Sequence, residues 1–106
     1  MLSNTQKQKF DDTKDLRVEL GHWLKAQRTA RDLSQRDLAA LLDLEYYTFI
    51  SQLENGRGRI PPSRYRDWAE ALGQDIRSFV LRLMEAYDPV TYEILYEDGA
   101  TGTDTR

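Results

Sequence analysis

The fold of this chain is decided by LSQRDLAALLDLEYYTFISQLENG, residues 33–56. Ser34 precedes a helical pattern and Asp37 stands three residues further on, so the first-turn N–H groups have side-chain acceptors. A second helical pattern follows at once and ends at Asn55-Gly56, residue types that adopt left-handed conformations. Because so few residues separate the two patterns, the stretch predicts two short helices packed against each other. The apolar stripes are Leu38, Ala39, Leu41 and Leu42 in the first helix and Tyr47, Ile50 and Leu53 in the second.

This pattern resembles the helix-turn-helix of the phage repressor/Cro family, whose members are also called XRE regulators. The resemblance covers roughly residues 20–80 and rests on the order and spacing of Arg28, Leu33-Ser34-Gln35, Leu38-Ala39, Ile50-Ser51, Glu54-Asn55-Gly56 and Ala71-Leu72-Gly73. It implies an all-α, five-helix, lambda-repressor-like domain that places its second motif helix, the recognition helix, in the major groove of DNA. It also implies a structural ion pair between Arg28 and Glu54 that ties the first helix to the recognition helix.

Composition limits the class of protein. The chain has 106 residues, enough for one domain with a single modest core. It has no cysteine, which excludes disulfides, thiolate metal sites and cysteine nucleophiles. No apolar run reaches the ~20 residues that cross a bilayer, and the polar start lacks the apolar core of a signal peptide. We therefore expect a cytoplasmic protein with no membrane partner.

Charge is distributed unevenly along the chain. The formal net charge is −3, which is unusual for a protein that binds a polyanion. Residues 22–66 nevertheless hold eight basic against five acidic side chains, and no acidic residue lies between Arg57 and Arg66. The sequence therefore predicts a local positive strip, just after the helix pair, that can face phosphates.

The other elements complete a five-helix domain over residues 12–87. The remaining helices are expected at about 12–31, 62–72 and 75–87. Residues 1–11 predict a mobile polar arm and residues 97–106 a disordered tail. Residues 88–96 form a C-terminal extension that fits either a helix begun by Asp88-Pro89 or a strand. Its apolar Val90, Ile94 and Leu95 have no evident place in the domain core, so we expect them at a dimer interface.

Two departures from the family pattern concern turns. Asp32 stands where the family usually has glycine, and aspartate adopts a left-handed conformation less readily. The turn between the motif helices is one residue longer than usual, so the start of the recognition helix depends on which end anchors it. Anchoring from the turn begins the base-facing positions at Tyr46. We anchor from the C-terminal end, because Ile50 and Leu53 must face the core. The outward positions are then Thr48, Ser51, Gln52 and Asn55.

The predicted DNA contacts form two groups. Base contacts are expected from the exposed face and start of the recognition helix, at Tyr47, Thr48, Ser51, Gln52 and Asn55. Phosphate contacts are expected from the start of the first motif helix, the turn and the basic strip, at Ser34, Gln35, Arg36, Tyr46, Arg57, Arg59 and Arg64. The two tyrosines stay ambiguous, since a tyrosine at a helix start can contact phosphate, contact a thymine methyl or pack inward.

No catalytic chemistry is evident. His22 is the only histidine, so neither a metal site of the usual kind nor a histidine-based catalytic set can be built. No glycine-rich phosphate loop precedes a helix. We expect neither an enzyme nor a bound metal or cofactor.

Three functions compete for this sequence. The favoured one is a transcription regulator that binds double-stranded operator DNA as a homodimer on an inverted repeat. The alternative is an antitoxin or antiactivator that regulates its own promoter with the same motif and holds a protein partner through the C-terminal segment. An adaptor that keeps the fold without binding DNA is disfavoured by the arginines of residues 57–66.

Overall fold

A computed structural model describes residues 4–96, with side chains described from residue 15 onward. This part of the chain contains six α-helices, one short 3-10 helix and no strand. The elements are α1 (Asn4–Ala30), α2 (Gln35–Leu41), α3 (Thr48–Glu54), η1 (Pro62–Arg64), α4 (Tyr65–Ala71), α5 (Ile76–Tyr87) and α6 (Pro89–Tyr96). The predicted all-α class is confirmed.

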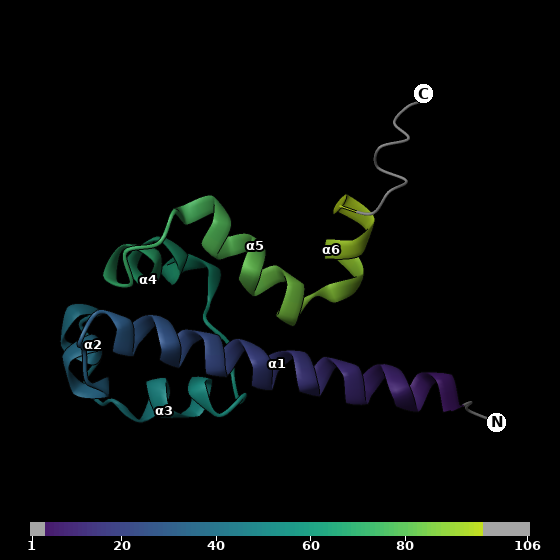
Figure 1. Cartoon of the computed structure of the whole chain (residues 1–106), viewed down its shortest axis with the longest axis horizontal. Helices are drawn as coiled ribbons and strands as arrows, with labels where there is room; N and C mark the ends of the chain where they lie inside the picture. Colours follow the sequence, from purple (N-terminus) through teal and green to yellow (C-terminus); the bar gives the residue numbers. More distant parts are fainter. Residues whose placement is uncertain (1–3, 97–106) are drawn as a thin grey trace.

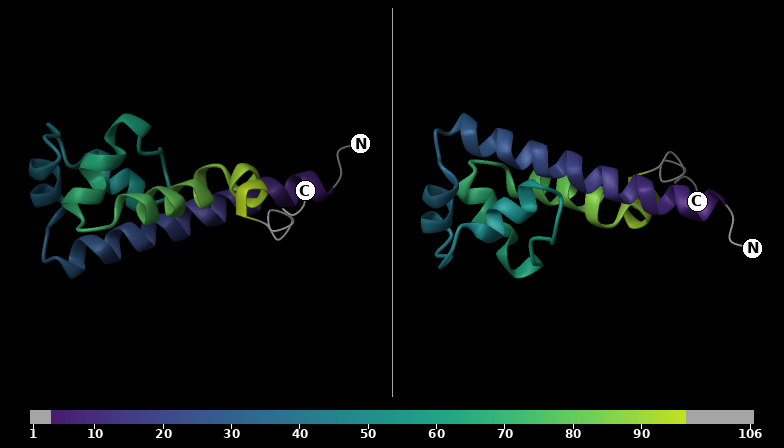
Figure 2. Two further views of the ribbon diagram at one scale, coloured as in Figure 1. Left: turned by 90° about the horizontal axis from the view of Figure 1, so that it is seen from above. Right: turned by 90° about the horizontal axis from the view of Figure 1, so that it is seen from below.

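Helix α1 is the axis on which the other helices pack. It runs along the length of the molecule, with α3 on one side and α4 and α5 on the other (Figure 1). Both α3 and α5 contact α1 directly, whereas α2 contacts α3 and α4 contacts α5. The views from above and below place α2 at the C-terminal end of α1 (Figure 2). Of the two motif helices, α3 is therefore supported directly by α1, and α2 is supported by its packing on α3.

One continuous core joins these helices. Its largest fully buried side chains are Trp68, Phe79, Leu38, Leu42, Ile50, Ile60, Leu72 and Leu83. Full burial of an apolar side chain of this kind contributes about 1.5–3 kcal/mol.

The prediction that Leu41 belongs to the apolar stripe of α2 is wrong, since Leu41 is 60% exposed. Leu38 and Leu42, one turn apart, already fill the inward positions of this short helix.

Helices α1 to α4 end in the same hydrogen-bonded motif. After each one, a residue with positive φ turns the chain, and the next N–H group bonds a carbonyl five residues earlier. Glycine takes the positive φ after α3 and α4, whereas Asp32 (φ 59°) and Asp43 (φ 58°) take it after α1 and α2. Asp32 thus forms this turn without a glycine. Asp43 lies within the longer turn of the motif and adopts the conformation that a glycine commonly supplies there.

The first helix begins earlier than predicted. Helix α1 starts at Asn4 instead of near Asp12, so the predicted polar arm is wrong for residues 4–11. These residues carry no apolar period, but they also contain no glycine or proline and are rich in glutamine and lysine, which have good helix propensity. The backbone can therefore continue the helix. The predicted tail, residues 97–106, lies outside the described residues.

The C-terminal extension is a helix, not a strand. Asp88 caps it, because its Oδ1 accepts the Thr91 N–H at 3.4 Å and its carbonyl accepts the Tyr92 N–H at 3.0 Å. Pro89 occupies the first helical position, where a missing N–H is tolerated. Helix α6 packs on α5 and continues the chain away from the core (Figure 1).

Candidate nucleic-acid interface

Helix α2 begins with a complete capping box. The Ser34 hydroxyl accepts the Asp37 N–H, and Asp37 Oδ2 accepts the Ser34 N–H, both at 2.9 Å. The backbone N–H of Ser34, with a further contribution from its side chain, lowers the pKa of the Asp37 carboxyl. Because the pKa of Asp37 is lower in the folded state than in the unfolded state, the cap stabilises the fold at pH values above the unfolded-state pKa. This stabilisation is lost as the pH falls through the folded-state pKa. The Ser34 oxygen is used in this cap, so a phosphate contact there would need its hydroxyl hydrogen.

A buried ion pair connects α1 to α3. Arg28 Nε donates to Glu54 Oε2 at 2.7 Å and Arg28 Nη2 donates to Oε1 at 3.0 Å. Each residue is only 7% exposed. Arg28 Nη1 also donates to the Leu33 carbonyl at 2.8 Å, at the start of the turn into α2. The pair implied by the family resemblance is therefore present, and its bidentate geometry orients α3 against α1.

Gln35 extends this network to α2. Its Nε2 donates to Glu54 Oε1 at 3.0 Å, and the side chain is half-buried. One of its two amide hydrogens is therefore used inside the protein, which leaves one for the predicted phosphate contact. Gln35 thus positions the motif helices in addition to any contact with DNA.

Gly21 allows α3 to approach α1 closely. A β-carbon on Gly21 would lie 2.5 Å from the Glu54 carbonyl oxygen and 2.7 Å from that of Leu53. Glycine inside a helix destabilises it by roughly 0.5–1 kcal/mol relative to alanine. The close approach of α3 explains why this position nevertheless holds glycine. Gly21 was not among the predicted site positions. A glycine within a helical pattern is the signal that could have identified it.

The outer face of α3 carries hydrogen-bonding side chains. Ile50 and Leu53 are buried, so the expectation that these two side chains face the core is confirmed. Thr48 and Gln52 are exposed and Ser51 is half-buried. Asn55 is exposed, but its Nδ2 donates to the Ser51 carbonyl at 2.9 Å, so part of its amide caps the helix. Hydroxyl and amide groups of this kind can bind base edges in the major groove.

The comparison with known families agrees with this geometry. Residues 24–79, more than half of the chain, match a family model described as helix-turn-helix, HTH_3. The chain belongs to the HTH_3 family. This family is of the XRE type and its domain implies DNA binding, so the predicted family, fold and DNA-binding activity are confirmed. The family is also non-enzymatic, as expected. No curated protein and no solved structure matched the chain.

An arginine of α2 in the HTH_3 domain stacks on a tyrosine at the start of α3. Arg36 Cζ lies 5.1 Å from the centre of the Tyr47 ring, within the range of a cation–π interaction. Tyr47 is the N-cap residue of α3 and is 38% exposed, whereas Tyr46 is 67% exposed. The structure therefore brings two predicted contact residues together at the start of the recognition helix, with Tyr46 beside them in the chain.

The basic strip is only partly assembled. Arg57 and Arg59 are exposed in the connection after α3. Arg64 is held inward, because its Nη1 donates to Asp67 Oδ2 at 2.8 Å and its Nη2 donates to the Leu42 carbonyl at the end of α2. A cation at the C-terminal carbonyls of a helix is also favoured by the helix dipole. Arg64 therefore lies at the junction between α2 and η1, where two of its guanidinium nitrogens already have partners within the protein.

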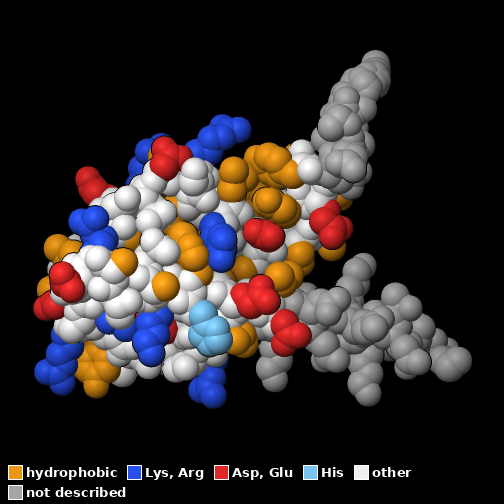
Figure 3. All heavy atoms as spheres, viewed as in Figure 1, with side chains coloured by type: hydrophobic (Ala, Val, Ile, Leu, Met, Phe, Trp, Pro, Cys, Tyr) orange, Lys and Arg blue, Asp and Glu red, His pale blue; other side chains and the backbone are white. Residues whose placement is uncertain are grey.

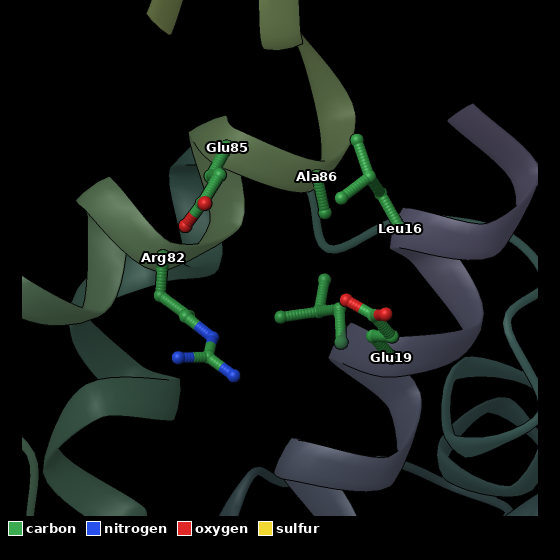
Figure 4. A pocket seen from close by; sticks show the side chains of 6 residues that line it. Leu16, Glu19, Arg82, Glu85 and Ala86 are labelled. Carbon is green, nitrogen blue, oxygen red and sulfur yellow. The ribbon is translucent and has the colours of Figure 1, made fainter. Parts of the chain in front are cut away.

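A separate pocket lies on another part of the HTH_3 chain. It has a volume of about 240 Å³ between α1 and α5, and Figure 4 shows Leu16 and Glu19 facing Arg82 and Glu85 across it. None of its lining residues belongs to α2 or α3, so it lies apart from the two helices of the motif.

Neither a metal centre nor a membrane span is found in the described part of the chain. No group of three histidine, cysteine, aspartate or glutamate side chains there could hold a metal ion. His22, the pale blue side chain in Figure 3, lies exposed on α1. None of the described helices is long and apolar enough to cross a membrane.

Proposed function

We propose that this chain is a sequence-specific transcription regulator that binds operator DNA as a homodimer on an inverted repeat. The observation that carries this proposal is the outward, hydrogen-bonding face of α3, which the buried Arg28–Glu54 pair holds in one orientation. Each good base contact contributes ~1–3 kcal/mol of discrimination. A face that is already ordered loses less conformational entropy on binding. Such a regulator would act in the cytoplasm, where its operator lies.

The proposed contacts follow the two predicted groups, with one change. Base edges are read by Tyr47, Thr48, Ser51, Gln52 and Asn55, and phosphates are bound by Ser34, Gln35, Arg36, Tyr46, Arg57 and Arg59. Arg64 is left out of the second group because its guanidinium is held by Asp67 and the end of α2. Phosphate contacts set the position of the domain on the duplex, and base contacts set its sequence preference.

Gln52→Ala is expected to relax the base preference at one position of the half-site. Its amide is exposed on α3 and can form a bidentate contact with an adenine edge, worth ~1–3 kcal/mol of discrimination. The measurement is selection of bound fragments from a random DNA pool, followed by sequencing. Glu70→Ala, an exposed change on α4, is the control and should return the parent consensus. Equal consensus and equal tolerance for Gln52→Ala would contradict the assignment of α3 as the reading helix.

Helix α6 supplies the surface for the proposed dimer. Val90, Ile94 and Leu95 are 51%, 60% and 53% exposed. Hydrophobic side chains gather at the corner formed by α5 and α6 in Figure 3. A contiguous apolar surface of this kind favours association. A two-fold pair of domains reads two half-sites about 34 Å apart, which adds the recognition energies of both.

Ile94→Lys is expected to make the protein monomeric, because a charge in an apolar interface loses its hydration without gaining a partner. Sedimentation at micromolar concentration should show a dimer for the parent and a monomer for the variant. The variant should lose most of its affinity for a full inverted repeat and keep the weak affinity for a half-site. Glu93→Lys, a charge change at the neighbouring exposed position, is the control and should remain dimeric.

The same experiment separates the regulator from the alternative function. An antitoxin or antiactivator would use the exposed residues of α6 for a different protein and would not need them for a homodimer. A parent chain that stays monomeric while binding operator DNA would therefore favour a protein partner at α6. A dimeric parent that Ile94→Lys dissociates supports the homodimeric regulator.

A further inference from the structure

Two arginines from distant parts of the chain meet at one aromatic ring. Arg17 lies in α1, and Arg59 lies in the connection between α3 and η1. Their Cζ atoms are 5.5 Å and 4.8 Å from the centre of the Tyr87 ring. Tyr87, the last residue of α5, is 8% exposed, and its hydroxyl accepts the Ile60 N–H at 3.1 Å. A buried and hydrogen-bonded ring therefore fixes the position of both guanidinium groups.

Neither guanidinium has a counter-ion among the described side chains. Within residues 15–96 the ion pairs are Arg28 with Glu54 and Arg64 with Asp67. The Nε atom of Arg17 is buried without a hydrogen-bond partner. Burial raises the pKa of the Tyr87 phenol, whereas the Ile60 N–H and the two arginines act to lower it. Because the pKa is raised overall, the phenol stays neutral. Two like charges are thus held near one another without compensation, and an anion that reaches both would lower their energy.

The two arginines lie between the recognition helix and α6. Arg59 comes shortly after the end of α3. Next to Arg17, Val18 lies against the point where the chain leaves α3, since a β-carbon on Gly56 would be 3.0 Å from Val18 Cγ2. Helix α6 begins directly beyond Tyr87 and Asp88.

We propose that Arg17 and Arg59, held by the ring of Tyr87, bind a phosphate of the DNA backbone on the α6 side of the recognition helix. This inference rests on the proposed DNA-binding function and extends its footprint to Arg17 of α1. Guanidinium N–H groups match phosphate oxygens, and stacking restricts the side chains while leaving those N–H edges available. Less conformational entropy is then lost when the phosphate binds. Tyr87 acts as a platform and makes no contact with DNA itself.

The test is the salt dependence of binding to a duplex of random sequence. The full-length parent, Arg17→Gln, Arg17→Lys and Arg59→Gln are titrated at several salt concentrations, and log Kobs is plotted against log salt. Loss of one phosphate contact should make the slope shallower by about 0.9. We expect this change for Arg17→Gln and for Arg59→Gln, and a slope near that of the parent for Arg17→Lys, which keeps the charge.

Arg82→Gln is the matched control. Arg82 is also stacked on an aromatic ring, with its Cζ 4.9 Å from the centre of the Trp23 ring, but it lines the pocket of Figure 4. The Arg82→Gln substitution removes the same charge at a position away from the proposed phosphate, so it should keep the parent slope. An equal reduction of the slope in Arg82→Gln would show a general effect of net charge and overturn the proposal.

Three further outcomes distinguish this inference from the function on which it rests. If Arg17→Gln melts at a lower temperature but keeps the parent slope, Arg17 only stabilises the fold and the phosphate site is overturned. If Arg17→Gln does not fold, Arg59→Gln decides, and an unchanged slope there overturns the site. A parent that binds no duplex at any salt concentration contradicts the proposed function itself.

Discussion

Replacing Gly21 with alanine is expected to lower both stability and operator affinity, although Gly21 lies behind the recognition helix. The added methyl group would meet the carbonyl oxygens of Glu54 and Leu53 at 2.5 and 2.7 Å. These are backbone atoms of α3, so the clash can be relieved only if α3 and α1 move apart. Helix propensity alone predicts the opposite sign, a gain of about 0.5–1 kcal/mol. Overpacking costs typically ~1–3 kcal/mol, so crowding should exceed that gain.

The effect on DNA binding follows from the displacement of α3. Hydrogen bonds to base edges depend on distance and angle, and each misplaced contact loses about 1–3 kcal/mol of discrimination. We therefore expect specific affinity to fall by about tenfold or more, and binding to random duplexes to change much less because phosphate contacts tolerate small shifts.

Urea unfolding and titration of the selected operator measure the two effects of Gly21→Ala. His22→Ala changes the neighbouring, exposed position of α1 and is the control. It should leave the midpoint of unfolding and the operator affinity close to those of the parent. An alanine variant at position 21 that is more stable than the parent would show that helix propensity dominates and that the close approach is not limiting.

Local spacing predicted the motif, and the family resemblance implied the ion pair that connects it to α1. The helix-turn-helix, the phase of α3 and the pairing of Arg28 with Glu54 depend on short-range periodicity and on a pattern shared by the family. The choice between helix and strand for residues 88–96 stayed open because Val90, Tyr92 and Ile94 alternate as strand residues do. The cap at Asp88 and the proline at the first helical position decide it locally.

What could not be predicted depends on contacts between distant segments. Arg64 belongs to a basic stretch, yet its direction is set by the carbonyl of Leu42, which only the packed fold brings near. Arg17 has no sequence signal, because its neighbours Tyr87 and Arg59 come from other elements. The early start of α1 was missed for a different reason. Polar residues carry no apolar period, so only their propensity indicates a helix.

Arg28→Met is expected to be the most destabilising of the substitutions considered. It leaves the Glu54 carboxylate 7% exposed with only the Gln35 amide as a side-chain partner, and it removes the donor to the Leu33 carbonyl. Removing one partner of a buried ion pair costs about 3–5 kcal/mol, because the remaining charge is buried without compensation. For a domain of this size, a loss of that magnitude is a large part of the total stability.

The double variant Arg28→Met/Glu54→Met separates the cost of the unpaired charge from the value of the pair. Replacing both partners of a buried pair by apolar groups is often close to neutral. Here Gln35 and the Leu33 carbonyl also lose their partners, so we expect a residual cost of about 1 kcal/mol for each. The double variant should therefore be more stable than Arg28→Met alone. Urea unfolding of the parent, both single variants and the double variant gives the coupling energy, and strictly additive losses would show that Arg28 and Glu54 stabilise the fold independently.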